Sequence, residues 1–142
     1  IPVSDELITW YTSADLEALE SRSDTGFLTA FIRRYAPVCS ALICQNDEIA
    51  YWLIRELQYA NIRVPEDISV VSFDNSYMSE LGSVRITSLS HKEHEMGTAA
   101  ASTLLRMIHG ESVFSEELSW RLIEKESDTV WVEQGNKHRH ES

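Results

Sequence analysis

Two pairs of neighbouring polar residues could recognise a ligand that is rich in hydroxyl groups. Asn46 and Asp47 follow one apolar segment, and Asp74 and Asn75 follow another. A carboxylate accepts two hydrogen bonds from adjacent hydroxyls, whereas a side-chain amide both donates and accepts. A small set of such groups at one edge of a pocket suits a polyhydroxy ligand such as a sugar.

An aromatic ring beside these groups could cover the apolar C–H face of a sugar. Trp10 and Tyr11 lie near the end of the first predicted strand and could supply such a ring. A plainer interpretation also stays open, because the first polar pair could only cap a helix and the second could only form a turn. The residue types alone do not decide between the two.

Motifs of enzymes and metal centres are weak or absent in the sequence. There is no glycine-rich phosphate loop, no Gly-x-Ser-x-Gly and no His-Glu-x-x-His. His91 and His94 could supply two ligands to a metal ion, but a catalytic metal centre needs a more complete set. We therefore expect no enzymatic activity, no catalytic residue, no bound metal and no cofactor.

The composition is that of an ordinary globular domain. The chain has 142 residues, of which 43% are hydrophobic and 25% charged, and it has no apolar run long enough to span a membrane. The net charge of −11 predicts that the chain as a whole is repelled by nucleic acid. The chain begins with Ile1, so we expect it to be processed or to belong to a longer protein.

The two cysteines indicate a reducing compartment. Cys39 and Cys44 are five residues apart, and Cys44 lies in an apolar run that is typical of a buried strand. We therefore expect both to be small core residues without a disulfide, in a cytoplasmic protein.

Strands and helices alternate along the chain. The patterning predicts strands over residues 7–12, 40–45, 68–73, 86–89 and 119–126, with residues 40–45 buried on both faces. It predicts helices over residues 25–35, from Asn46 or Asp47 to 60, and 94–109. Residues 13–24 fit a short helix or a loop, residues 77–84 fit a loop or a short helix, and residues 134–142 are predicted to be disordered.

This alternation predicts an α/β fold with a doubly wound, mostly parallel sheet and helices on both of its faces. In such sheets, ligands bind at the carboxyl ends of the strands. Both polar pairs follow predicted strands, so we expect them to lie at the same edge of the sheet.

Several longer motifs resemble a known family. They are Asn46-Asp47-Glu48-Ile49-Ala50, the run from Arg63 to Ser76 (RVPEDISVVSFDNS), residues 86–89 with 96–100, and residues 121–127. Together they resemble the effector-binding domain of lac-repressor-type (LacI/GalR) regulators, over residues 1–130. The distance from Asn46 to Asp74 agrees with that family without a gap.

The resemblance implies a two-lobed fold similar to that of periplasmic sugar-binding proteins, with the ligand between the lobes of a dimeric protein. By position, Asn46 and Asp74 match residues that bind sugar hydroxyls, and Tyr11 lies near a ligand-contacting position. His91 falls at the crossover between lobes, where the resemblance implies a hinge or pocket role. Asn75 is also a candidate contact, although it stands where many relatives have Asp.

A narrower resemblance concerns arabinose repressors. Tyr11-Thr12 and the run from Val84 to Lys92 are similar to that group, which joins a winged-helix DNA-binding segment of the GntR class to a sugar-binding module. This implies L-arabinose as the effector. It also implies that residues 1–133 form the C-terminal lobe, with residues 86–110 as the hinge crossover strand and helix. The N-terminal lobe and the segment that contacts operator DNA would be missing.

We therefore expect the ligand-sensing part of a transcriptional repressor. The alternatives are a solute-binding protein of a sugar transporter, which shares the fold, and an enzyme of the doubly wound class. Without a first lobe, Met96, Ala100, Leu104 and Met107 on the last helix have no obvious cover. We expect this apolar patch to make the chain self-associate.

Overall fold

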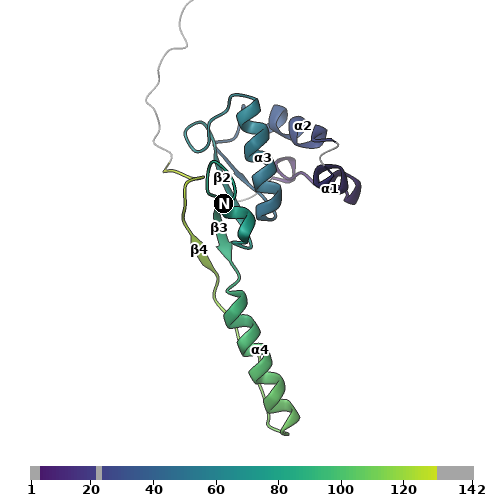
Figure 1. The fold of residues 1–142 in the computed structure, drawn as a ribbon, viewed down its shortest axis with the longest axis vertical. Coiled ribbons are helices and arrows are strands. Elements are labelled where there is room, and N and C mark those ends of the chain that lie inside the picture. Colours follow the sequence, from purple (N-terminus) through teal and green to yellow (C-terminus); the bar gives the residue numbers. More distant parts are fainter. Residues whose placement is uncertain (1–3, 22–23, 131–142) are drawn as a thin grey trace, which may run out of the picture.

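The computed structural model describes residues 4–21 and 24–130 (Figure 1). The elements follow the chain as η1 (Asp5–Leu7), α1 (Ser13–Glu20), α2 (Gly26–Tyr35), β1 (Ala41–Ile43), α3 (Asp47–Tyr59), β2 (Ser69–Phe73), η2 (Tyr77–Glu80), β3 (Thr87–Ser90), α4 (Glu93–Ile108) and β4 (Arg121–Ile123). Four strands form one sheet in the order β1-β2-β3-β4. This arrangement confirms the prediction of an α/β fold with a mostly parallel sheet and flanking helices.

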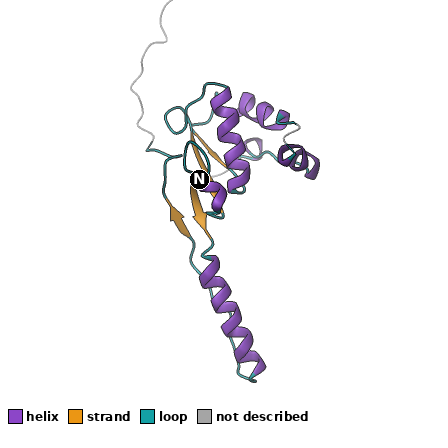
Figure 2. Cartoon of the chain, in the orientation of Figure 1, coloured by secondary structure: helices purple, strands orange, loops and turns teal. Residues whose placement is uncertain are grey.

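The register of the strands brings their carboxyl ends to one edge. The pairs β1–β2 and β2–β3 are parallel, with Ile43 opposite Val71 and Phe73 opposite Leu89. β4 runs antiparallel to β3 and places Arg121 opposite Ser90. The segments that follow β1, β2 and β3 therefore leave the sheet at the same edge. Figure 2 shows β3 and β4 side by side with their arrows in opposite directions.

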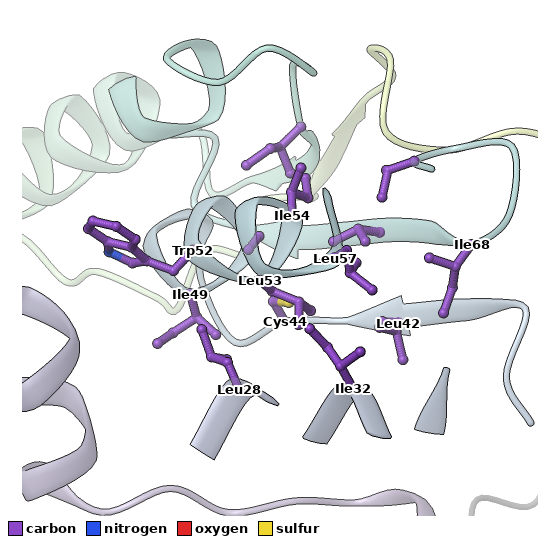
Figure 3. Packing of buried hydrophobic residues seen from close by; sticks show 14 of the residues in the cluster. Leu28, Ile32, Leu42, Cys44, Ile49, Trp52, Leu53, Ile54, Leu57 and Ile68 are labelled. Atoms are coloured by element: carbon purple, nitrogen blue, oxygen red, sulfur yellow. The ribbon is translucent and has the colours of Figure 1, made fainter. Parts of the chain in front are cut away.

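The core lies between the sheet and helices α2 and α3 (Figure 3). α3 forms because apolar residues recur every three to four positions, and Ile49, Leu53 and Leu57 bury this stripe. On the sheet, Leu42 and Val70 lie opposite one another and are buried. Ile43 on the other face of β1 is 71% exposed. Among the described residues, none covers the face of β1 that carries Ile43. The prediction that residues 40–45 are buried on both faces is therefore wrong.

The predicted strand over residues 7–12 is also wrong. Residues 5–7 form the short helix η1, and Ile8 is extended but has no strand partner among the described residues. Aromatic and β-branched residues favour extended backbone, but a strand also needs a neighbour to complete its hydrogen bonds. Thr12 then starts α1 through a capping box with Asp15. The helix alternative for residues 13–24 is thus the one observed, over Ser13–Glu20.

The remaining predicted elements are confirmed with shifted ends. The predicted strand over residues 119–126 is shorter as β4, and the predicted segment 77–84 contains the short helix η2. α4 ends before Gly110, whose φ of +78° favours glycine. The predicted disorder over residues 134–142 lies outside the described residues. None of the described helices has the length and apolar character that crossing a membrane requires.

α4 projects away from the rest of the described chain (Figure 1). Its apolar side chains are largely accessible, with Met96 49%, Leu104 58% and Met107 56% exposed. Residues from the segment 114–118 line a shallow hollow together with the helix, but Phe114 in this segment is itself 88% exposed. The apolar face of α4 therefore has no cover among the described residues, as the sequence predicts.

We predict that the 142-residue chain self-associates through this face, because exposed contiguous apolar surface drives association. Light scattering after gel filtration should give more than one chain per particle. The double variant Leu104→Glu/Met107→Glu should shift the population toward single chains. Ser102→Glu places a single negative charge on the opposite side of α4 and should leave the assembly unchanged. A wild-type chain that stays monomeric at high concentration would contradict the prediction.

Candidate functional site

A buried carboxylate organises the edge where the strands end. Asp47, the first residue of α3, is 1% exposed and accepts three hydrogen bonds. Its Oδ1 accepts from the hydroxyls of Ser72 and Ser88, the latter at 2.7 Å, and its Oδ2 accepts from the backbone N–H of Ser76. A buried charge is tolerated only when it is paired or fully hydrogen-bonded. Asp47 therefore joins the start of α3 to β2, to β3 and to the turn after β2.

The turn after β2 presents the polar side chains. Asp74 and Asn75 have φ values of +96° and +50°, in the left-handed region that Asp and Asn tolerate better than most residues. The N–H of Asp74 donates to the carbonyl of Leu89, and the N–H of Asn75 donates to the hydroxyl of Ser88. Backbone hydrogen bonds on both residues thus fix the direction in which Asp74 leaves the strand.

Asp74 meets His91, one residue beyond β3. Nε2 of His91 lies 2.9 Å from Oδ1 of Asp74, and because an ionised carboxylate only accepts, the imidazole N–H donates. The side chains are 33% and 42% exposed, respectively, so water or a ligand can reach both. The carboxylate of Asp74 can accept further hydrogen bonds besides the one from His91.

Asn46 takes the capping role that the sequence leaves open for it. Its side-chain oxygen accepts from the N–H of Ile49 at 3.0 Å, so it is the N-cap of α3. This use of the oxygen leaves the amide NH₂ as the group that could donate to a ligand. Asp47, the alternative cap, serves instead as the buried hydrogen-bond acceptor described above.

Tyr11 lies at the other end of this edge, beside β1. Its hydroxyl donates to the side-chain oxygen of Gln45, the neighbour of Asn46. Partial burial, with smaller effects from Cys44 and Glu48, raises the pKa of the Tyr11 phenol, so this hydroxyl stays protonated at neutral pH. A mostly apolar groove of about 370 Å³ runs here. Its lining includes Tyr11, Gln45 and Phe73.

The five predicted site residues thus fall into two groups. The structure joins Asp74 directly to His91, and Asn75 belongs to the same turn. Tyr11 reaches the residue beside Asn46 but has no contact with Asp74 in the structure. Trp10, the other aromatic residue considered, is 88% exposed.

Chemistry based on thiols or metal ions has little support at this edge. Both cysteines are free, and burial raises the pKa of the Cys44 thiol to about 12, with Asp47 as a smaller cause. That thiol is therefore protonated and unreactive at neutral pH. Among residues 4–21 and 24–130, no three His, Cys, Asp or Glu side chains gather in a way that could hold a metal ion.

Sequence reasoning misses four residues that shape this site. Gln45 carries no motif, and the motif that contains Ser88 gives this serine no role; their partners lie 34 and 41 residues away along the chain. Trp120, whose ring lies 4.2 Å from that of His91, reaches the site only through the antiparallel pairing of β4 with β3. The hydroxyl of Ser72, which donates to the buried Asp47, is likewise not singled out by the sequence.

Comparison with known proteins gives a consistent result. Residues 4–127 match the model of the periplasmic binding protein-like domain. The chain is 38% identical over 74 residues to the arabinose metabolism transcriptional repressor of Geobacillus stearothermophilus, covering 52% of this chain and 20% of the repressor. The chain therefore spans about a fifth of the length of this curated relative.

Solved structures agree with this assignment of the fold. A LacI family transcriptional regulator from Bifidobacterium animalis superposes with a TM-score of 0.65 and 33% identity, over 71% of this chain and 39% of that one. A LacI family regulator from an Arthrobacter species, solved in complex with lactose, gives a TM-score of 0.64 at 27% identity, over 72% and 40%.

We predict that Asp47→Ala lowers the free energy of unfolding by about 3 kcal/mol or more, because two buried serine hydroxyls and the partly buried N–H of Ser76 lose their acceptor. Ser72→Ala removes one donor and should cost about 1 kcal/mol. Urea unfolding measures both. Glu48→Ala, one residue away in the same helical turn, is the matched control and should cost about 0.5 kcal/mol. Equal losses for Asp47→Ala and Glu48→Ala would show that Asp47 does not hold this edge together.

Proposed function

The chain belongs to the periplasmic binding protein-like family, and we propose that it is the C-terminal lobe of the ligand-sensing domain of a bacterial transcriptional repressor. The observation that carries this proposal is the solvent-accessible pair of Asp74 and His91 at the carboxyl ends of parallel strands. Ligands bind at this edge in open α/β sheets. The likeness to an arabinose repressor supports a regulatory role.

The proposed ligand is a small sugar, and L-arabinose is the first candidate. An accessible carboxylate, an amide and an imidazole at one edge can together accept from and donate to neighbouring hydroxyls. Asp74 is the central acceptor, Asn46 and Asn75 supply amides, and His91 orients the carboxylate. Tyr11 approaches from the β1 side with its hydroxyl held by Gln45. The arabinose repressor among the relatives is what favours a pentose over other sugars.

The proposed response is a shift between two lobe arrangements. We assign residues 1–133 to one lobe and residues 86–110 to the crossover, in which α4 begins two residues after His91. A sugar that contacts both lobes binds the closed arrangement more tightly than the open one, and only this difference in affinity can shift the equilibrium. His91 lies at the site and, within the crossover, between β3 and α4, so ligand contacts at Asp74 bear directly on the segment that links the lobes.

The proposed partners follow from charge and exposed surface. The net charge of −11 makes this chain a poor surface for DNA, so operator binding belongs to a separate segment of the longer protein. We propose that the protein acts as a homodimer in the cytoplasm. The exposed apolar face of α4 is the surface that the N-terminal lobe would cover.

Calorimetric titration of L-arabinose into the complete gene product that carries this sequence tests the proposal. We expect binding, and we expect Asp74→Ala to weaken it about ten- to a hundredfold, because a charged acceptor is lost. Asp74→Asn keeps a residue that tolerates positive φ, and it should also weaken binding, which separates loss of the carboxylate from backbone strain. Asp67→Ala removes an exposed carboxylate that pairs with Arg63 before β2 and should bind as wild type does.

Each failure has its own meaning. No heat with L-arabinose, but binding of another pentose or a hexose, would refute L-arabinose as the effector and leave the sugar sensor. Binding of a nucleobase alone would refute the sugar assignment and leave the sensor. Binding that Asp74→Ala and Asp74→Asn do not weaken would refute the assignment of Asp74. Sugar binding by a gene product that has a secretory signal and no DNA-binding segment would favour a solute-binding protein of a transporter.

A further inference from the structure

Trp120 precedes β4 and is the one aromatic side chain in contact with His91 among the described residues. The pairing of Arg121 with Ser90 places Trp120 across from His91. The two ring centroids lie 4.2 Å apart with an interplanar angle of 52°. Because His91 also donates to Asp74, the indole, the imidazole and the carboxylate form one continuous group.

A second ring fixes the orientation of the indole. The ring of Phe73, at the end of β2, lies 6.2 Å from that of Trp120 at an interplanar angle of 86°. This edge-to-face geometry is one of the two that aromatic pairs prefer. Phe73 from β2 and His91 from the segment after β3 therefore hold Trp120 in place. Both are neighbours of Asp74, because Phe73 precedes it in the chain and His91 forms a hydrogen bond with it.

The indole nevertheless remains 54% exposed. A hollow of about 250 Å³ opens beside it, lined by His91, Met96, Glu116, Leu118 and Trp120. A large apolar ring that is oriented by its neighbours but open to solvent offers a flat surface to a ligand. The same surface lies next to groups that bind hydroxyls, and sugars present both kinds of surface, since C–H faces alternate with hydroxyl edges.

We propose that Trp120 is a ligand-binding residue whose indole packs against the apolar face of the sugar while Asp74 accepts from its hydroxyls. This inference rests on the proposed function and assigns the aromatic role to Trp120 in place of Trp10. Trp10 is 88% exposed and belongs to the lining of the groove beside Tyr11, whereas Trp120 and His91 line a hollow together. His91 then serves as the positioning residue between the two, because it contacts the indole and the carboxylate together.

Titration of sugar into the complete gene product and its variants tests this assignment. Trp120→Ala should weaken binding about tenfold, the size expected when an aromatic contact is lost. Trp120→Phe keeps a ring and should lose less. Tyr59→Ala removes another exposed aromatic side chain, at the far end of α3, and should bind as wild type does. Urea unfolding of each variant checks that the fold is retained.

Fluorescence gives a second measurement that a purely structural role would not affect. Sugar should change the tryptophan emission of the wild-type protein and of Tyr59→Ala, and this change should largely disappear in Trp120→Phe.

The outcomes separate the two proposals. Absence of sugar binding by the wild-type protein would refute the proposed function and this assignment with it. Wild-type binding that Trp120→Ala leaves intact would refute the role of Trp120 alone. Loss of binding in Trp10→Ala but not in Trp120→Ala would assign the aromatic contact to Trp10 instead.

Discussion

The candidate site depends on one buried carboxylate. Asp47 places a charge where water does not reach, which is costly unless donors surround it. Two serine hydroxyls and one backbone N–H do so, and they come from β2, from β3 and from the turn between them. The Ser88 hydroxyl also accepts from the N–H of Asn75, so the network extends into the turn that holds Asp74. The accessible carboxylate is thus positioned by the buried one.

The opposite edge of the sheet is closed by the C-terminal segment. Ser127 is buried. Its hydroxyl donates a hydrogen bond to the carbonyl of Val70 and accepts one from the N–H of Thr87. These bonds hold β4 in place and, through β4, hold Trp120 against His91. The surfaces without cover lie elsewhere, on the outer face of β1 and on α4. Their exposure is consistent with the proposal that a second lobe completes the protein.

Local patterns predict most of the fold and part of the site. Helical spacing identifies α3 and α4, and short apolar runs identify the strands, because each signal is contained within a few residues. The strand predicted over residues 7–12 fails because pairing depends on a neighbour that local sequence cannot reveal. Asp74 and His91 are found from the sequence, whereas Gln45, Ser88 and Trp120 are not. Their contacts arise from strand register, which joins residues far apart in the chain.

A crystal structure of the complete gene product with the bound sugar tests the central claim most directly. The account predicts that the sugar lies at the carboxyl ends of β1, β2 and β3. It also predicts that a ligand hydroxyl donates to the carboxylate of Asp74 while Asp47 keeps its three donors. A sugar bound at another edge, with Asp74 contacting only His91, would contradict it.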